Sequence, residues 1–351
     1  MRSPKRTGER LLAFLTVIVI CTSLVLCSCS KGTGLSSSEE EKKVVMTVGG
    51  YDVSYELYRY LVMNYKAQYD ASVWESPDSL AAANEEIEEN TEQSLRDIFA
   101  VFSLAGDYGI DFDDEDLKSI ADAAVDAEKD KYEKVSDYKD ALAESYMNDS
   151  VYRFAELNKA FSDALYYAME NSGEIETDAS KLRELFNSDS FIRVKQVLIV
   201  GESARKAYNN TYFTTAETHT DSEALEIAEK VRALALSGEN FDSLVKEYGE
   251  SLYMFNNTDG YYICRGMWEE ANENAAFSLN VGEISPVIES SAGYSVFMRC
   301  EKDSAYIDVN FDSLCSDYRK AVFGLALEKR SASLEIEKTQ ALDSCSIAEM
   351  Q

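Results

Sequence analysis

Residues 197–200 read Val-Leu-Ile-Val, a run of aliphatic and mostly β-branched residues that predicts a buried strand. Gln196 stands directly before this run. A polar side chain at the head of a core strand either satisfies a local hydrogen bond or lines a site. The chain before residue 190 has mainly helical periodicity, so this strand marks the start of a domain of a different kind.

The first part of the chain, residues 44–190, predicts a helical domain. A short hairpin is expected at residues 44–53 because Gly49 and Gly50 interrupt an apolar run. Ser54 is typical of the N-cap of a helix. The helix that follows Ser54 carries several tyrosines, which offer amphipathic contact area for binding other chains. Further helices are predicted at residues 78–106, 113–133, 136–147, 149–171 and 177–187.

Residues 191–302 predict a compact α+β domain with the element order β-α-α-β-α-β-β. After the first strand, residues 201–220 are expected to form a polar loop that holds the single histidine, His219, at the surface. Two capped helices, a short strand, a third helix and two strands follow. Residues 306–340 predict one long helix whose apolar stripe packs on the N-terminal helices. The fold class is therefore α+β, with a mainly helical body (residues 44–190 and 303–351) and an inserted domain.

The N-terminus reads as an export signal. Basic residues precede an apolar segment, residues 11–26, which is shorter than the roughly 20 residues of a membrane span. The following Leu26-Cys27-Ser28-Cys29 resembles a bacterial lipobox, with Cys29 as the lipidated residue. An uncleaved N-terminal anchor is the alternative. Residues 1–28 are then a lipoprotein signal peptide and residues 29–43 a flexible stalk, and we expect an extracytoplasmic protein held on the bacterial cell membrane.

The charge balance limits the partners of this chain. It has 64 acidic against 34 basic residues, a net charge of −30, which disfavours binding to nucleic acid. One histidine and irregular cysteine spacings suggest no metal site, so none is expected. The acidic run at residues 111–116 lacks the glycine of a calcium loop and is interpreted as a helix N-terminus. Disulfide pairing stays open for Cys264, Cys300, Cys315 and Cys345.

Three stretches of the second domain resemble parvulin-type peptidyl-prolyl isomerases. Residues 228–248 are similar to the first two helices of that family. Residues 266–287 resemble its third helix, turn and third strand, and residues 293–299 (Gly-Tyr-Ser-Val-Phe-Met-Arg) its closing strand. The segment from residue 44 to residue 57 resembles the start of the chaperone part of PrsA- and SurA-like foldases. With the lipobox and the C-terminal helix, the whole chain resembles a PrsA-like foldase lipoprotein.

This resemblance implies a four-stranded antiparallel sheet flanked by helices and rotation about X–Pro bonds, which needs no cofactor. The implied partners are unfolded or newly exported polypeptides. The family's two histidines fall on Gln196 and Ser295, and its Cys or Asp falls on Ser251. Its apolar cup for the proline ring, built from Leu, Met and Phe, falls on Tyr262, Trp268 and Asn272.

Two functions follow from these substitutions. One is an active isomerase with a rebuilt centre, in which Gln196, Ser251 and Ser295 form a hydrogen-bonded network and Tyr262 with Trp268 stacks on the proline ring. The other is a chaperone or binding lipoprotein whose parvulin domain has lost its activity, because neither family histidine remains and Asn272 brings an amide into the cup. A lipoprotein without any folding role is the third alternative.

Overall fold

The computed structural model describes residues 43–70, 73–74, 77–208, 213–214 and 218–350. These residues divide into two compact units: the helical body, residues 43–172 with 326–350, and the four-stranded unit, residues 173–325. The expected α+β class, with a helical body formed from both ends of the chain, is confirmed. The predicted signal peptide, Cys29 and all of the stalk except residue 43 lie outside the described residues. No helix in the described part is long and apolar enough to cross a membrane.

The helical body begins with the expected hairpin, β1 (Val44–Val48) and β2 (Tyr51–Ser54). The side chain of Ser54 caps α2 (Tyr55–Lys66) by accepting the Leu57 N–H. Four more helices follow: α3 (Pro77–Asp107), α4 (Glu115–Lys129), α5 (Val135–Glu144) and α6 (Asp149–Ser172). Tyr58 and Tyr60 of α2 are buried, so these two tyrosines are core residues and offer no contact area to other chains.

The C-terminal segment differs from the single helix predicted at residues 306–340. It forms α13 (Ser304–Val309), α14 (Phe311–Ser333) and a strand, β7 (Ile336–Lys338). β7 pairs antiparallel with β1 and completes a sheet of order β2-β1-β7. Three residues are too few for a strand signal in the sequence, and the free edge of β1 decides their conformation.

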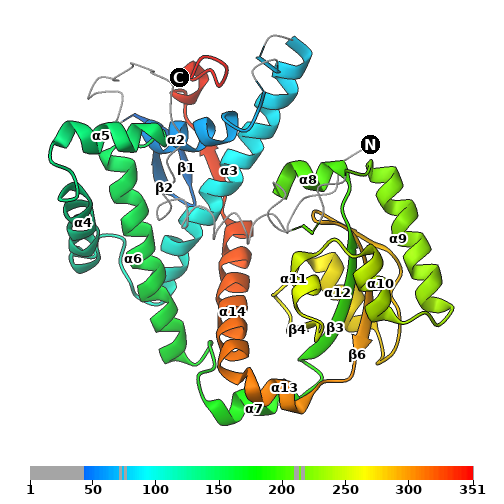
Figure 1. Ribbon diagram of the computed structural model, residues 1–351. Coiled ribbons are helices and arrows are strands. Elements are labelled where there is room, and N and C mark those ends of the chain that lie inside the picture. The colour runs from blue at the N-terminus through cyan, green and yellow to red at the C-terminus, as the bar shows by residue number, and fades with distance from the viewer. Residues whose placement is uncertain (1–42, 71–72, 75–76, 209–212, 215–217, 351) are drawn as a thin grey trace. The chain divides into compact units, whose positions relative to one another are not determined.

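The four-stranded unit contains the expected antiparallel sheet, of order β4-β3-β6-β5 (Figure 1). Its strands are β3 (Ile192–Ile199), β4 (Tyr261–Ile263), β5 (Ile288–Ser290) and β6 (Gly293–Cys300). The helices between them are α9 (Asp221–Leu236), α10 (Phe241–Tyr248), α11 (Leu252–Asn256) and α12 (Glu270–Ser278). The prediction of a loop over residues 201–220 is wrong in part, because α8 (Glu202–Tyr208) forms there. The short helix α11 was also not predicted.

Helices cover both faces of this sheet. Val197, Ile199 and Val296 pack with apolar residues of α9 and α10 on one face. Ile192, Val194 and Ile263 pack with Ala276 of α12 on the other. Since neighbouring residues of a strand point to opposite faces, Gln196 shares the α12 face with Ile192 and Val194.

The four-stranded unit extends beyond residues 191–302. Leu182 and Phe186 of α7 (Ala179–Asn187) form a buried cluster with residues of β4, α13 and α14. α14 belongs to the four-stranded unit up to Leu325 and to the helical body from Ala326 onward. The first half of the C-terminal helix therefore packs on its own unit, and only residues 326–350 belong to the body.

Candidate functional site

Gln196 and Ser295 meet across the central strand pair of the four-stranded sheet. Gln196 of β3 lies opposite Phe297 of β6, and Ser295 lies opposite Leu198. The Gln196 Nε2 donates to Ser295 Oγ over 2.8 Å. Both side chains are buried, and Ser295 has no exposed surface. The polar residue at the head of the core strand therefore satisfies a hydrogen bond to the second of the two positions at which the resemblance implies a histidine.

Ser251 takes a different set of partners. It is the N-cap of α11 and accepts the Met254 N–H. Its Oγ lies 3.1 Å from the Tyr261 hydroxyl, and either oxygen is able to donate. Among the hydrogen bonds of the described residues, none joins Ser251 to Gln196 or Ser295. The expected network of three is thus two separate pairs, Gln196–Ser295 and Ser251–Tyr261.

Tyr262 does not lie with Trp268. In the β3–β4 ladder Tyr262 is opposite Arg193 and Tyr261 is opposite Val194, so the two tyrosines point to opposite faces. The Tyr262 ring stacks on Tyr306 with 4.6 Å between centroids, in the cluster formed with α7 and α13. The expected cup position therefore belongs to Tyr261, one residue earlier. A strand of three residues gives no period from which its register is predictable.

Four aromatic rings form a continuous ladder on the α12 side of the sheet. Tyr253 of α11 stacks on Tyr261 with centroids 4.3 Å apart and 15° between the planes. Tyr261 meets Trp268 edge to face at 4.9 Å, and Trp268 stacks on Phe297 at 5.5 Å. Since Phe297 is the cross-strand neighbour of Gln196, the ladder leads from the surface to the Gln196–Ser295 pair.

Trp268 is held from α12 by a residue that the sequence did not single out. The buried Glu273 accepts the backbone N–H groups of Gly266 and Trp268 with one carboxylate oxygen, at 2.5 and 3.1 Å. Asn272, the third expected cup residue, lies half-buried on the same helix. Its Oδ1 is buried and accepts no hydrogen bond from the described residues. Asn272 therefore places a buried amide oxygen at the position where the resemblance implies an apolar cup residue.

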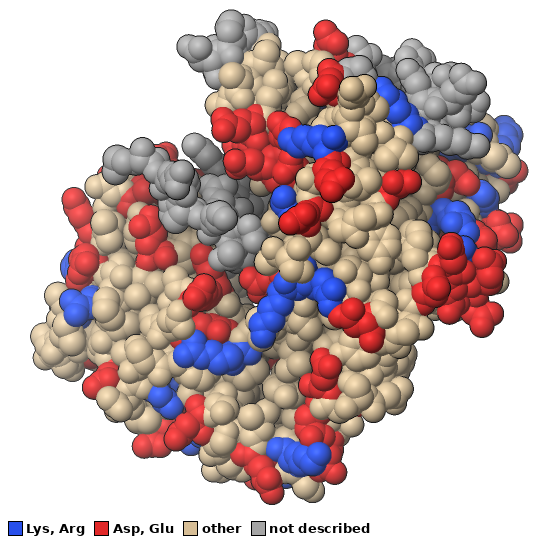
Figure 2. All heavy atoms as spheres, turned by 180° about the vertical axis from the view of Figure 1, so that it is seen from behind, with Lys and Arg blue, Asp and Glu red and all other residues tan. Residues whose placement is uncertain are grey.

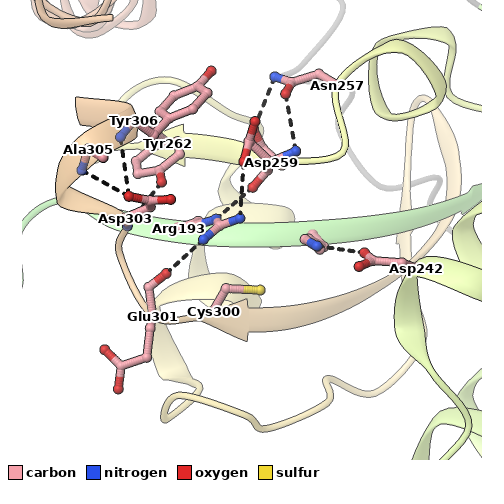
Figure 3. Close-up of polar contacts among 12 residues, drawn as sticks. Arg193, Asp242, Asn257, Asp259, Tyr262, Cys300, Glu301, Asp303, Ala305 and Tyr306 are labelled. Carbon is pink, nitrogen blue, oxygen red and sulfur yellow. Dashed lines mark hydrogen bonds and ion pairs between the residues drawn. The ribbon is translucent and has the colours of Figure 1, made fainter. Parts of the chain in front are cut away.

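A polar cluster before β4 fixes the turn 257–260, which joins α11 with Tyr253 to β4 with Tyr261 (Figure 3). Arg193 donates from Nε to the Asp259 carbonyl over 2.6 Å and from Nη1 to the Glu301 carbonyl over 3.2 Å. Asn257 accepts the Asp259 N–H, and its Nδ2 donates to the Gly260 carbonyl and, over 2.7 Å, to the Tyr253 hydroxyl. The turn 257–260 is thus held by Arg193 of β3 and by its own first residue, Asn257.

The electrostatics of the site keep its hydroxyl groups neutral. Burial raises the pKa of Tyr261 to about 12, and the hydrogen bond with Ser251 opposes that shift. Beside Ser251, burial also raises the pKa of Glu250, although it accepts the Val200 N–H and lies near Arg205 and His219. His219 Nε2 is 3.3 Å from the Glu250 carboxylate, so this histidine contacts a buried acid at the edge of the sheet. Neutral hydroxyl and amide donors next to an apolar aromatic wall are suited to holding a peptide.

Within the described residues, no group of three or more His, Cys, Asp or Glu side chains is placed to hold a metal ion. Cys264, Cys300, Cys315 and Cys345 are free thiols, and Cys264 and Cys315 are buried in the same cluster as Tyr262.

Comparison with known proteins finds similarity over the second part of the chain. Residues 209–301 match the model described as the PPIC-type PPIase domain, or rotamase. A stretch of 83 residues is 31% identical to the foldase protein PrsA of Bacillus subtilis (strain 168). That match covers 23% of this chain and 28% of PrsA, so the chain spans less than a third of its relative in the alignment.

Solved structures of similar proteins cover more of the chain at low similarity. PrsA from Bacillus anthracis is 16% identical with a TM-score of 0.34, over 68% of this chain and 95% of that one. PrsA from Streptococcus pneumoniae is 17% identical with a TM-score of 0.32, over 75% and 93%. The chain therefore contains a stretch that matches the PPIC-type PPIase domain, residues 209–301, and it is similar to PrsA over part of its length.

Proposed function

We propose that this protein is an extracytoplasmic foldase, which binds exported polypeptides before they have folded and accelerates rotation about their X–Pro bonds. The single observation that carries the proposal is the ladder from Tyr261 through Trp268 to Phe297, which ends at the Gln196–Ser295 pair in a parvulin-type domain. It combines an aromatic wall for a proline ring with neutral hydrogen-bonding groups. We propose that the isomerase activity lies in residues 191–302 and the chaperone function in residues 44–190 with 303–351, although residues 173–190 and 303–325 group with the four-stranded unit.

The reaction needs only differential binding of the twisted peptide bond. Uncatalysed X–Pro rotation crosses a barrier of about 20 kcal/mol and takes tens to hundreds of seconds. A hundredfold acceleration requires about 2.7 kcal/mol of extra stabilisation in the transition state, which is within reach of one or two hydrogen bonds. In the twisted state the amide loses its resonance, and the proline nitrogen becomes a hydrogen-bond acceptor. Trp268 would hold the ring, and Ser251 and Tyr261 would supply the nearby hydroxyl groups.

The test is isomerisation of a proline-containing peptide by the full chain. We expect a rate at least a hundredfold above background that is lost in Trp268→Ala. Trp74→Ala is a matched control, because Trp74 is the other tryptophan and belongs to the helical body. A background rate in the wild type would contradict the catalytic proposal.

A non-catalytic chaperone is the second candidate. It is favoured by the hydrogen bond that already joins Gln196 to Ser295, and by Asn272, an amide at a position where the resemblance implies an apolar residue. This function predicts that the wild type slows aggregation of an unfolded client and binds the peptide at Trp268 without accelerating isomerisation. Running both assays on one preparation separates the two functions.

We further propose that Cys29 is lipidated and tethers the protein to the bacterial cell membrane through the stalk. Support comes from the Leu26-Cys27-Ser28-Cys29 sequence alone. Membrane fractionation of wild type and Cys29→Ser tests it: the variant should leave the membrane fraction. Retention of Cys29→Ser on the membrane would favour the uncleaved anchor.

A further inference from the structure

Helix α11 exposes three large apolar side chains next to the site. Leu252, Tyr253 and Phe255 are 40%, 47% and 60% exposed, although the helix has only five residues. The fourth apolar residue, Met254, is buried and anchors the helix to the core. Clustered apolar side chains at a surface mark a binding region more often than single ones do.

This exposed group is continuous with the site. The Tyr253 ring lies on Tyr261, which in turn meets Trp268. Through these contacts Tyr253 lies within about 9 Å of the Trp268 ring, a distance that an extended peptide covers in about three residues. A peptide with its proline ring at Trp268 therefore brings a nearby side chain to Tyr253.

The Tyr253 ring is fixed before any peptide arrives. Asn257 Nδ2 donates to its hydroxyl over 2.7 Å and also holds the Gly260 carbonyl. Arg193 binds the Asp259 carbonyl of the same turn from the opposite side (Figure 3). A ring held in place loses little conformational entropy on binding, which favours a selective contact over a loose one.

The charge of this region limits the kind of segment that it accepts. Three acidic side chains between residues 250 and 278 are not buried, Asp259, Glu269 and Glu270, against one basic one, Arg265. Arg193 pairs with Asp259, and the other two acidic residues of this stretch, Glu250 and Glu273, are buried. Acidic side chains also outnumber basic ones in the whole chain, and they are spread over the face drawn in Figure 2. This excess of acidic side chains favours neutral or basic segments over acidic ones.

We propose that Tyr253, resting on Tyr261, is a specificity element: it binds an aromatic side chain within three residues of the proline, in a neutral or basic segment of an unfolded polypeptide. This inference rests on the proposed function, since it requires the proline at Trp268. On this inference, α11 determines which proline-containing segments are bound, and Trp268 holds the proline ring.

The experiment compares two peptides by the fluorescence of Trp268 in a Trp74→Phe background. Both peptides carry one proline and flanking arginines, and they differ by Phe or Ala two residues before the proline. A third peptide replaces the arginines with glutamates. We expect the Phe peptide to bind about tenfold more tightly than the Ala peptide, and the glutamate peptide to bind more weakly than either. Tyr253→Ala should remove the preference, so that the Phe and Ala peptides bind equally, whereas Tyr253→Phe should keep it.

Tyr167→Ala is the matched control, because Tyr167 is an exposed tyrosine of the helical body that also contacts a neighbouring tyrosine ring. Circular dichroism checks that Tyr253→Ala is folded. Equal binding of the Phe and Ala peptides to the wild type, with Trp268 still responding, would overturn the inference and leave the proposed function standing. No response to any peptide would overturn both.

Discussion

Replacing Ser295 by alanine tests whether the Gln196–Ser295 pair is a specific contact of the site. The hydroxyl is fully buried and accepts the Gln196 Nε2 over 2.8 Å. Without it, a buried amide donor loses its partner, which costs about 1–3 kcal/mol of unfolding free energy. Gln196→Leu should cost a similar amount, because it leaves the Ser295 hydroxyl unpaired. The double variant removes both polar groups, so its cost should be smaller than the sum by about 1 kcal/mol or more.

Urea unfolding followed by Trp268 fluorescence measures these costs in the four-stranded unit alone, once Trp74 is replaced by Phe. Ser278→Ala is the control. That serine is exposed on α12 and donates only to the carbonyl of Ala275, so we expect a change within about 0.5 kcal/mol. The reasoning is refuted if Ser295→Ala costs no more than Ser278→Ala, or if the costs of the two single variants simply add.

Three further variants probe the turn and the ladder. Gly260→Ala should destabilise the unit by about 2 kcal/mol in the same urea assay, and by more than Gly282→Ala does. Both glycines have left-handed φ angles, but a Cβ at Gly260 would also lie 2.5 Å from the Val194 carbonyl oxygen, whereas a Cβ at Gly282 would meet no atom within 4 Å. Arg193→Met should weaken peptide binding more than Arg265→Met, since Arg193 holds the Asp259 carbonyl whereas Arg265 is exposed; equal effects would contradict its positioning role. The buried phenol of Tyr261 has its pKa raised to about 12, so its stabilising contribution is complete below pH 10 and is lost as the pH rises through 12. Tyr261→Phe should therefore lose less stability than wild type over that interval, and parallel pH profiles would contradict this assignment.

The sequence predicted the elements that carry a clear local pattern. The run at residues 197–200, the cap at Ser54 and the helices of the body all have periodicity or capping residues that act over a few positions. It did not predict α11 or β7, which are too short for a period and depend on contacts with distant segments. For the same reason the face of β4 was misassigned: in the pair Tyr261-Tyr262 both residues are aromatic, and only pairing with β3 decides which one faces Trp268.

The site was predicted in the same uneven way. Gln196 was singled out as the polar residue before a core strand, and Ser295 was assigned through the family resemblance; the pairing of β3 with β6 brings the two together. Arg193, Asn257 and Glu273 were missed because their roles lie in backbone groups that they hold. A charged or amide side chain in a sequence gives no sign of which distant carbonyl or N–H it binds.

The pairing of β1 with β7 sets the order in which the two units are able to finish folding. Thr339 Oγ1 donates to the Val44 carbonyl, 295 positions earlier in the chain, whereas the four-stranded unit is one continuous segment. During synthesis or export, in which the N-terminus comes first, residues 173–325 are complete while β1 still has a free edge. That edge stays open for pairing with other strands until the last residues appear. A truncation before residue 336 should therefore leave the four-stranded unit folded and turn the body into a species that aggregates.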